Sequence, residues 1–483
     1  MGKPKPDVRK LTPKSQDFSE WYNEVVKRAD MADHSEIRGC MVIKPYGFGL
    51  WENMRDALDR RIKETGHKNA YFPLFVPESL LKKEAEHVEG FAPEVAWVTH
   101  GGEEKLEERL AIRPTSEAVI CSIYAKWIQS YRDLPLLINQ WANVVRWEKR
   151  TRLFLRTSEF LWQEGHTCHR TEDEAQEETL KMLEVYREFL ETELAIPAIT
   201  GLKTDAEKFP GAQQTYTVEA LMSNGWALQA GTSHNLGQHF SKGFGIKFLD
   251  EDNAEKFVWQ TSWGVSTRLV GGVIMTHGDD QGLILPPRIA PHQAVIVPIY
   301  RDDTRDKVLE GARSLWKDLS AVARVELDDR DGFKPGWKFN EWEMRGVPLR
   351  IELGPRDLDA GTAVLGNRVT GEKEAVQLSA LREMLPKKLE AVQADLLARA
   401  KAHRDENTRP ASSLAELSEI VEKHGGFVSA GWDGDPATEA KVKEETKATI
   451  RCIPLKSGEP EAGMTDVVSG KAAKHRVLYA RAF

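Results

Sequence analysis

Residues 146–160 read RWEKRTRLFLRTSEF, and this stretch decides the fold of the chain. It places Arg146 and Glu148 ahead of a run that ends at Phe160, and Arg268 lies about 120 positions beyond Arg146. A guanidinium group binds phosphate oxygens in pairs, and an aromatic ring on a strand gives a stacking face for a purine. The pattern therefore favours ATP bound on an antiparallel sheet.

The sequence around this stretch predicts a hairpin with a cationic tip. Strands are expected over residues 136–147 and 154–162, joined by the charged turn of residues 148–152. A glycine-rich segment over residues 225–245 allows close backbone approach to a ligand. Apolar residues at helical spacing predict helices in the same unit over residues 17–29 and 51–63, and a charged helix is expected over residues 172–194.

The proline-rich residues 286–291 form the clearest linker, and a strand-like run, Ala294–Pro298, follows at once. Beyond it, helix-like and strand-like segments alternate as far as residue 376, which favours a small α/β domain. A long helix is expected over residues 386–403. A third unit follows, with helices over 414–424 and 437–447 and a packed apolar C-terminus. We therefore predict an α/β multidomain chain with domains over residues 1–287, 288–405 and 406–483.

The composition narrows the class of protein. At 483 residues the chain is long enough for several domains, and its formal charge of −8 argues against bulk coating of nucleic acid. Its apolar runs are far shorter than the roughly 20 residues that a membrane span needs. Residues 1–7 have no apolar stretch behind them, so we expect no secretory signal and a cytoplasmic location. The four dispersed cysteines suggest no disulfide framework.

Taken together, these segments resemble the class II aminoacyl-tRNA synthetases, and within them the prolyl-tRNA synthetases of the archaeal and eukaryotic type (type 3). Motif 1 resembles the helix over 51–63 with the strand-like run 70–76, motif 2 residues 146–160, and motif 3 residues 264–268. Signatures of the subgroup are RPTSE at 113–117, GTSHN at 231–235 and PGWKFNEW at 335–342. The resemblance covers nearly the whole chain and implies an antiparallel catalytic core, an α/β anticodon-binding domain and a small C-terminal domain.

The resemblance implies a set of nucleotide contacts. Arg146 would hold the α-phosphate of ATP and the proline carboxylate, and Arg268 would stack on adenine and reach the γ-phosphate. Glu148 would accept from the adenine amino group and Phe160 would stack beneath the ring. An isolated strand arginine is more often a surface ion pair, but four matched positions favour the nucleotide site. Further contacts to ATP or its Mg²⁺ are implied for Thr157, Ser158, Gln229, Thr232 and Ser266.

Thr115 and Glu117 match the amino-acid loop of the family. A secondary ammonium has two N–H donors, which suit a hydroxyl and a carboxylate. Trp162 and His234 are implied for the wall of the proline ring pocket, although lone residues of these types are more often core residues. Arg146 and Arg268 would stabilise charge while the proline carboxylate attacks ATP, a step that needs no protein acid or base.

Two further segments concern metals. Residues 166–169, HTCH, offer zinc-ligand types, but four adjacent residues are poor for tetrahedral geometry, so we favour no metal there. Relatives often carry four cysteines for a structural zinc near the C-terminus. In this chain Asp433, Thr438, Asp466 and Ser469 stand in those places, so we predict that the zinc is absent.

The resemblance also implies partners: tRNA(Pro), L-proline and a second copy of the chain in a homodimer. Contacts to the acceptor end are expected from Arg150 and Arg152, and contacts to the anticodon from Lys334, Lys338, Glu341 and Arg345. Only about 100 residues separate Phe160 from Gly264, which leaves no room for the bacterial editing domain. We therefore expect some charging with cysteine or alanine.

Two alternatives stay open from the sequence. One is a synthetase-like paralogue that binds tRNA and regulates without catalysis, although such proteins usually lose an arginine or the amino-acid loop that this chain keeps. The other is a different class II synthetase, of the threonine or serine type. The threonine type lacks support because no zinc-ligand set stands in the catalytic region, and the RPTSE loop favours proline over both types.

Overall fold

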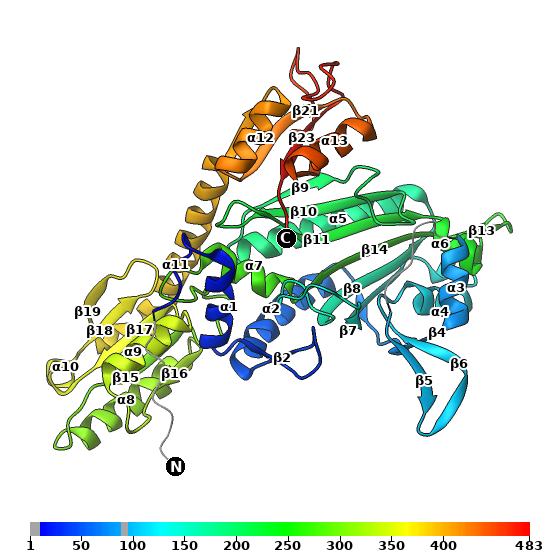
Figure 1. Cartoon of the computed structure of the whole chain (residues 1–483). Helices are drawn as coiled ribbons and strands as arrows, with labels where there is room; N and C mark the ends of the chain where they lie inside the picture. The colour runs from blue at the N-terminus through cyan, green and yellow to red at the C-terminus, as the bar shows by residue number, and fades with distance from the viewer. Residues whose placement is uncertain (1–9, 88–94) are drawn as a thin grey trace.

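The computed structural model describes residues 10–87 and 95–483; residues 1–7, where no secretory signal is expected, lie outside this range. The described chain is built around an 11-stranded, a five-stranded and a three-stranded sheet with helices packed on them (Figure 1). The predicted fold class, an α/β chain with an antiparallel core and smaller α/β units, is confirmed. Among the described residues, no helix has both the length and the apolar character to cross a membrane.

The central part of the large sheet carries the candidate site. Its strands run in the order β9-β10-β11-β14-β8-β7-β3, and every neighbouring pair except β3 and β7 is antiparallel. Helix α5 packs across β9, β10, β11 and β14. The first unit of the chain also contains smaller sheets, and its strands are β1 (Ala32–His34), β2 (Met41–Ile43), β3 (Lys68–Asn69), β4 (Phe75–Pro77), β5 (Trp97–Gly101), β6 (Glu104–Ile112), β7 (Leu136–Val145), β8 (Glu159–His169), β9 (Ala198–Leu202), β10 (Gln214–Leu221), β11 (Ala227–Gly237), β12 (Lys247–Leu249), β13 (Glu255–Phe257) and β14 (Trp259–Ser266). Its helices are α1 (Phe18–Arg28), α2 (Pro45–Glu64), α3 (Glu78–His87), α4 (Glu117–Trp127), α5 (Glu172–Thr192), α6 (His239–Phe244) and α7 (Arg268–His277).

Two expected strands are corrected. The run 70–76 is not one strand, because β3 ends at Asn69 and β4 begins at Phe75, with Pro73, which has no N–H to donate, between them. The second hairpin strand begins at Glu159 rather than residue 154. Residues 153–155 instead turn into the core, with Phe154 buried and at a φ of +62°.

The second unit is a five-stranded sheet with three parallel strands, in the order β16-β15-β17-β18-β19. The long helix begins at Leu378 rather than residue 386, so Pro386 lies inside it; Leu381, Leu385 and Leu389 pack on the core at helical spacing. The elements are β15 (Ala294–Pro298), α8 (Arg305–Leu319), β16 (Val325–Leu327), α9 (Pro335–Met344), β17 (Leu349–Leu353), α10 (Pro355–Ala360), β18 (Thr362–Asn367), β19 (Lys373–Gln377) and α11 (Leu378–Glu406).

The C-terminal unit extends the large sheet. Its strands run β20-β21-β23-β22, and β22 pairs with β9 through Ile453 opposite Leu202 and Pro454 opposite Gly201. The expected packed terminus is confirmed, because the Phe483 ring lies 5.1 Å from the Trp226 ring between centroids. The elements are β20 (Thr408–Ala411), α12 (Leu414–Lys423), β21 (Phe427–Trp432), α13 (Pro436–Thr446), β22 (Thr449–Pro454) and β23 (His475–Ala480).

Candidate active site

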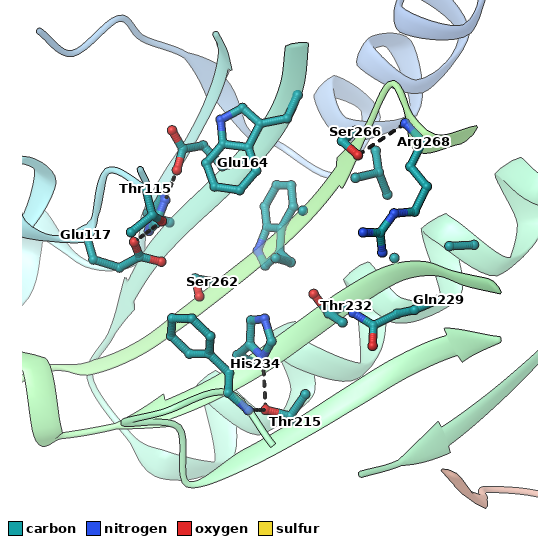
Figure 2. A pocket seen from close by; sticks show the side chains of 18 of the residues that line it. Thr115, Glu117, Glu164, Thr215, Gln229, Thr232, His234, Ser262, Ser266 and Arg268 are labelled. Carbon is teal, nitrogen blue, oxygen red and sulfur yellow. Dashed lines mark hydrogen bonds and ion pairs between the residues drawn. The ribbon is translucent and has the colours of Figure 1, made fainter. Parts of the chain in front are cut away.

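A cavity of about 330 Å³ opens on the face of strands β8, β11 and β14 (Figure 2). Ten of the residues expected to bind substrate line it together: Thr115, Glu117, Arg146, Phe160, Trp162, Gln229, Thr232, His234, Ser266 and Arg268. A second cavity of about 610 Å³ adjoins it and shares Arg146, Phe160, Ser266 and Arg268. The chain thus brings together side chains from four separate parts of the sequence.

Thr115 and Glu117 lie at one end of the first cavity, at the start of α4. Both are buried, and the Thr115 hydroxyl donates to a Glu117 carboxylate oxygen. The loop before them is held by Arg113, whose guanidinium donates to the carbonyls of Asn143 at 2.7 Å and Phe72 at 2.7 Å. A fixed carboxylate and hydroxyl side by side can accept from a small ammonium group.

Glu164 and His166 also line this end, and sequence reasoning missed both. Glu164 accepts from Ser116 Oγ at 2.5 Å and Gln140 Nε2 at 2.8 Å, and its other oxygen lies 3.0 Å from His166 Nε2. Burial alone lowers the pKa of His166, but the hydrogen bond to Glu164 and the charges of Glu117 and Glu164 raise it overall. Both residues share the strand face of Trp162 at a period of two, and this signal could have identified them.

His234 stands opposite, on β11. Its Nδ1 lies 3.0 Å from Thr215 Oγ1, and the Phe209 ring lies 4.8 Å from its imidazole between centroids. Burial, with the nearby charge of His166, lowers the pKa of His234 to about 3, so the ring is neutral at physiological pH. Phe209 was not expected at the site. The neutral ring and Phe209 make this wall suited to an apolar ring.

Arg146 lies between the Thr115–Glu117 loop and Arg268, which occupies the other end. Arg146 Nε donates to the Pro114 carbonyl at 2.9 Å, and its guanidinium lies 5.3 Å from the Trp162 ring centroid and 5.7 Å from that of Phe160. Burial, then the charges of Arg146 and Arg156, lower the pKa of Arg268 to about 10. Two cations that are close enough to disfavour each other form a ready site for a polyanion.

The second cavity contains the hairpin residues. Glu148, Arg150, Arg152 and Thr157 line it, together with Trp226, Ala482 and Phe483. Glu148 is paired with Arg156 Nε at 2.7 Å, and Arg152 donates to the Ser19 hydroxyl at the start of α1. Thr157 Oγ1 is buried and has no hydrogen-bond partner within the described part of the chain. The C-terminal residues reach this cavity through long-range pairing that the sequence does not signal.

Ser158 is the one expected nucleotide contact that lines neither cavity. It is buried beneath the hairpin, where its Oγ accepts from the Glu148 backbone N–H at 3.3 Å and packs against Gly39. Its place fits support of the hairpin rather than contact with a nucleotide.

The residues expected to contact the anticodon lie on or beside α9. Lys334 is exposed, whereas Lys338 is 2% exposed and donates to the Asp328 carbonyl at 2.8 Å. Lys338 therefore lies inside this unit, which does not fit a direct contact with RNA. Glu341 pairs with Arg330 at 2.5 Å, and Arg345 with Asp30 at 2.6 Å.

The candidate metal segments have other partners in this structure. Along β8 the side chains alternate, so His166 faces the cavity while His169 bonds Thr167 Oγ1 at 2.7 Å near α5. In the C-terminal unit, Asp433 accepts from Thr438 Oγ1 at 2.9 Å and Ser469 Oγ at 2.8 Å. Within residues 10–87 and 95–483 there is no group of three His, Cys, Asp or Glu that could hold a metal ion.

Comparison with known proteins gives consistent matches along the chain. The family models that match are the tRNA synthetase class II core domain (G, H, P, S and T) over residues 97–277, the anticodon binding domain over residues 293–388 and the prolyl-tRNA synthetase C-terminal domain over residues 414–483. The proline–tRNA ligase of Natranaerobius thermophilus is 57% identical over 478 residues, which is 99% of this chain and 98% of that protein. Those of Alkaliphilus oremlandii and Chloroherpeton thalassium are 57% and 56% identical, and the alignments cover at least 99% of each chain.

Proposed function

Because this chain belongs to the class II prolyl-tRNA synthetases, we propose that it activates L-proline with ATP and transfers the prolyl group to the 3′ end of tRNA(Pro). The observation that carries this function is the two-ended cavity. Thr115 and Glu117 stand at the end suited to an ammonium group, Arg268 stands at the end suited to phosphates, and Arg146 lies between them.

In the first step, a proline carboxylate oxygen forms a bond to the α-phosphorus of ATP while the bond to pyrophosphate breaks. The nucleophile is already ionised, so the chain has to supply position and positive charge rather than a base. Arg146 would hold the carboxylate and the α-phosphate, and Arg268 would hold the outer phosphates. The ring of Phe160 would stack on adenine, and Glu148 would accept from its amino group after exchanging its Arg156 partner.

Proline binding would use the other end of the cavity. Glu117 and Thr115 would accept the two N–H donors of the secondary ammonium. Trp162, His234 and Phe209 would enclose the apolar ring, with His234 neutral above about pH 3. In the second step the terminal ribose hydroxyl of the tRNA attacks the activated carbonyl, and AMP leaves.

Class II synthetases use ATP with Mg²⁺, and the residues present fit an ion that enters with the nucleotide. Mg²⁺ prefers oxygen ligands and keeps phosphates and waters around it. Gln229 and Thr232 line the first cavity, and their side-chain oxygens would complete such a shell, with Thr157 and Ser266 nearby at the nucleotide end. The ion would neutralise phosphate charge.

We further propose that the chain has the archaeal and eukaryotic (type 3) organisation without an editing insertion. Between β8 and β14, helices α5 and α6 and strands β9 to β13 account for the segment, and β9, β10 and β11 are part of the central sheet. We propose domains over residues 1–287, 288–405 and 406–483, and a cytoplasmic location, where tRNA charging supplies translation. Three exposed aromatic residues, Tyr71, Phe75 and Trp127, with exposed fractions of 72%, 46% and 50%, support the proposal of a homodimer.

We also propose that the C-terminal unit folds without zinc. Asp433 accepts hydrogen bonds from the hydroxyls of Thr438 and Ser469 and from the Asp435 N–H. These bonds join the residues that stand in place of the zinc-binding cysteines. We expect EDTA and 1,10-phenanthroline to leave the Tm unchanged, whereas Asp433→Ala should cost about 2 kcal/mol of stability. A chelator-induced fall in Tm, together with zinc found by elemental analysis, would contradict this proposal.

The activity is tested by charging tRNA(Pro) transcript with radiolabelled proline, with a transcript of altered anticodon as the control. We expect charging of the first and a large loss with the second. Binding of both transcripts without charging would favour the non-catalytic paralogue instead.

A further inference from the structure

Residues 203–213, between β9 and β10, form one wall of the first cavity, and we call them the wall segment. Glu207, Lys208 and Phe209 of this segment line the cavity, and Phe209 packs on His234. The segment contains no helix or strand. A segment of this kind opens locally at low free energy unless contacts elsewhere in the molecule hold it.

The catalytic unit, the proposed domain up to residue 287, holds the wall segment at its start and along its second half, where Phe209 and Ala212 also pack in a hydrophobic cluster. The Lys203 N–H donates to the Thr215 carbonyl at 2.8 Å, the Phe209 N–H donates to Thr215 Oγ1 at 2.9 Å, and the Gln213 N–H donates to the Asn235 carbonyl at 2.8 Å. His239 Nδ1 lies 2.9 Å from the Gly211 carbonyl, at an exposed position. The first half of the segment therefore depends on other partners.

Those partners come from α13 in the C-terminal unit, which lies next to this end of the large sheet (Figure 1). Thr204 Oγ1 donates to Glu439 Oε1 at 2.8 Å, and these residues are 3% and 6% exposed. One turn further along α13, Lys443 lies 3.2 Å from Glu207, in an exposed ion pair. The buried bond to a carboxylate is the stronger of the two links, because solvent screens the exposed pair.

The junction below this link is tightly packed and contains buried ion pairs. Strands β22 and β9 pair directly, and a Cβ on Gly201 would lie 2.5 Å from Cys452 Cβ, so only glycine allows this approach. Beside it, the fully buried Glu219 is bonded by Lys203 at 3.2 Å and by Arg451 at 3.0 Å. Lys203 thus fixes the start of the wall segment to a carboxylate that Arg451, on β22, also binds.

We propose that Glu439 is a positioning residue for the amino-acid pocket: it holds the wall segment through Thr204, so that Phe209 stays against His234 where proline binds. The inference rests on the proposed function in assigning proline to this end of the cavity. Without the bond, the competent position of the wall segment is only partly populated, and apparent proline affinity falls by that fraction. The nucleotide end, formed by Gln229 and Arg268, lies off the wall segment and keeps its affinity for ATP.

The test compares variants of the full-length chain by two independent readouts. Hydrogen exchange of residues 203–213 measures how often the wall segment opens and does not require activity. ATP–pyrophosphate exchange gives KM for proline and for ATP. We expect Glu439→Ala and Thr204→Val each to speed exchange in the segment and to raise KM for proline about three- to tenfold. KM for ATP and kcat should stay within twofold of wild type. The double variant should show no larger rise than either single variant, because both remove the same bond.

Controls on the same helix separate positioning from a general structural role. Glu439→Gln keeps an acceptor for Thr204 and should restore a near-normal KM for proline. Glu445→Ala, at an exposed position of α13, should change nothing. Unchanged hydrogen exchange in residues 203–213 of Glu439→Ala would overturn the proposal, as would equal rises in both KM values. Absence of proline-dependent ATP–pyrophosphate exchange in the wild type would instead refute the proposed function. Hydrogen exchange in residues 203–213 would still show whether Glu439 holds the wall segment.

Discussion

Within the described residues, the Arg146 guanidinium makes a single hydrogen bond to the protein. Its Nε donates to the Pro114 carbonyl, which belongs to the same loop as Thr115, so the arginine and the amino-acid loop are placed together. The rest of its guanidinium lies along the open cavity beside Phe160 and Trp162. This arrangement gives a preorganised cation at the point where a carboxylate and an α-phosphate would meet.

We therefore predict that Arg146→Ala costs at least about 3 kcal/mol of transition-state stabilisation, a loss of roughly a hundredfold or more in kcat/KM for pyrophosphate exchange. The Tm should change little, because the side chain is exposed along the cavity. Arg150→Ala, on the hairpin tip, is the matched control: exchange should persist while tRNA charging weakens. Near-normal exchange by folded Arg146→Ala would remove this arginine from the mechanism.

His277 gives a prediction on pH. It ends α7 and lies 2.9 Å from the Leu194 carbonyl, and burial lowers its pKa to about 4 from 6.5. The unfolded state then binds more protons between these values, so the stabilisation is complete above about pH 6.5 and falls as pH falls toward 4. Through His277, the wild type should lose about 2 kcal/mol of unfolding free energy between pH 7 and pH 5, and His277→Gln should remove this loss. Equal slopes for variant and wild type, measured by urea unfolding from pH 7 to 5, would contradict it.

At the scale of elements, regular periodicity made much of the fold predictable. Helix α8 and strand β17 belong to the alternating helix-like and strand-like segments expected as far as residue 376, because an apolar face decides each. Residues 154 and 155 were expected in a strand, but their apolar side chains anchor a turn in the core. Along β8, alternation from Phe160 and Trp162 would have revealed Glu164 and His166, had it been extended.

Two lysines on or beside helix α9 differ in their exposure to solvent. Lys338 is buried against Asp328, and Lys334 is exposed, although both were expected to bind RNA. We predict that Lys338→Met destabilises the chain by about 2 kcal/mol, because a buried carbonyl and a carboxylate lose a charged donor. Lys334→Ala should leave the Tm unchanged and raise only KM for tRNA. An unchanged Tm for Lys338→Met would show that the lysine does not stabilise this unit.

At the scale of the whole molecule, one sheet runs from β20 in the C-terminal unit to β3 in the catalytic unit. The sequence predicted the units but not this continuity, because the pairing of β22 with β9 joins residues about 250 positions apart. For the same reason Phe209 and Phe483 could not be placed at the cavities. Their positions depend on Thr215 and Trp226, which long-range packing brings near them.

The most direct measurement is amino-acid-dependent ATP–pyrophosphate exchange on the purified chain without tRNA, with proline, cysteine, alanine, threonine and serine. We predict the highest kcat/KM with proline and weaker exchange with cysteine and alanine, since a small apolar pocket discriminates poorly among residues of similar size. Threonine and serine should give none. Exchange strongest with another amino acid, or none with any of the five from a folded chain that binds tRNA, would contradict the account.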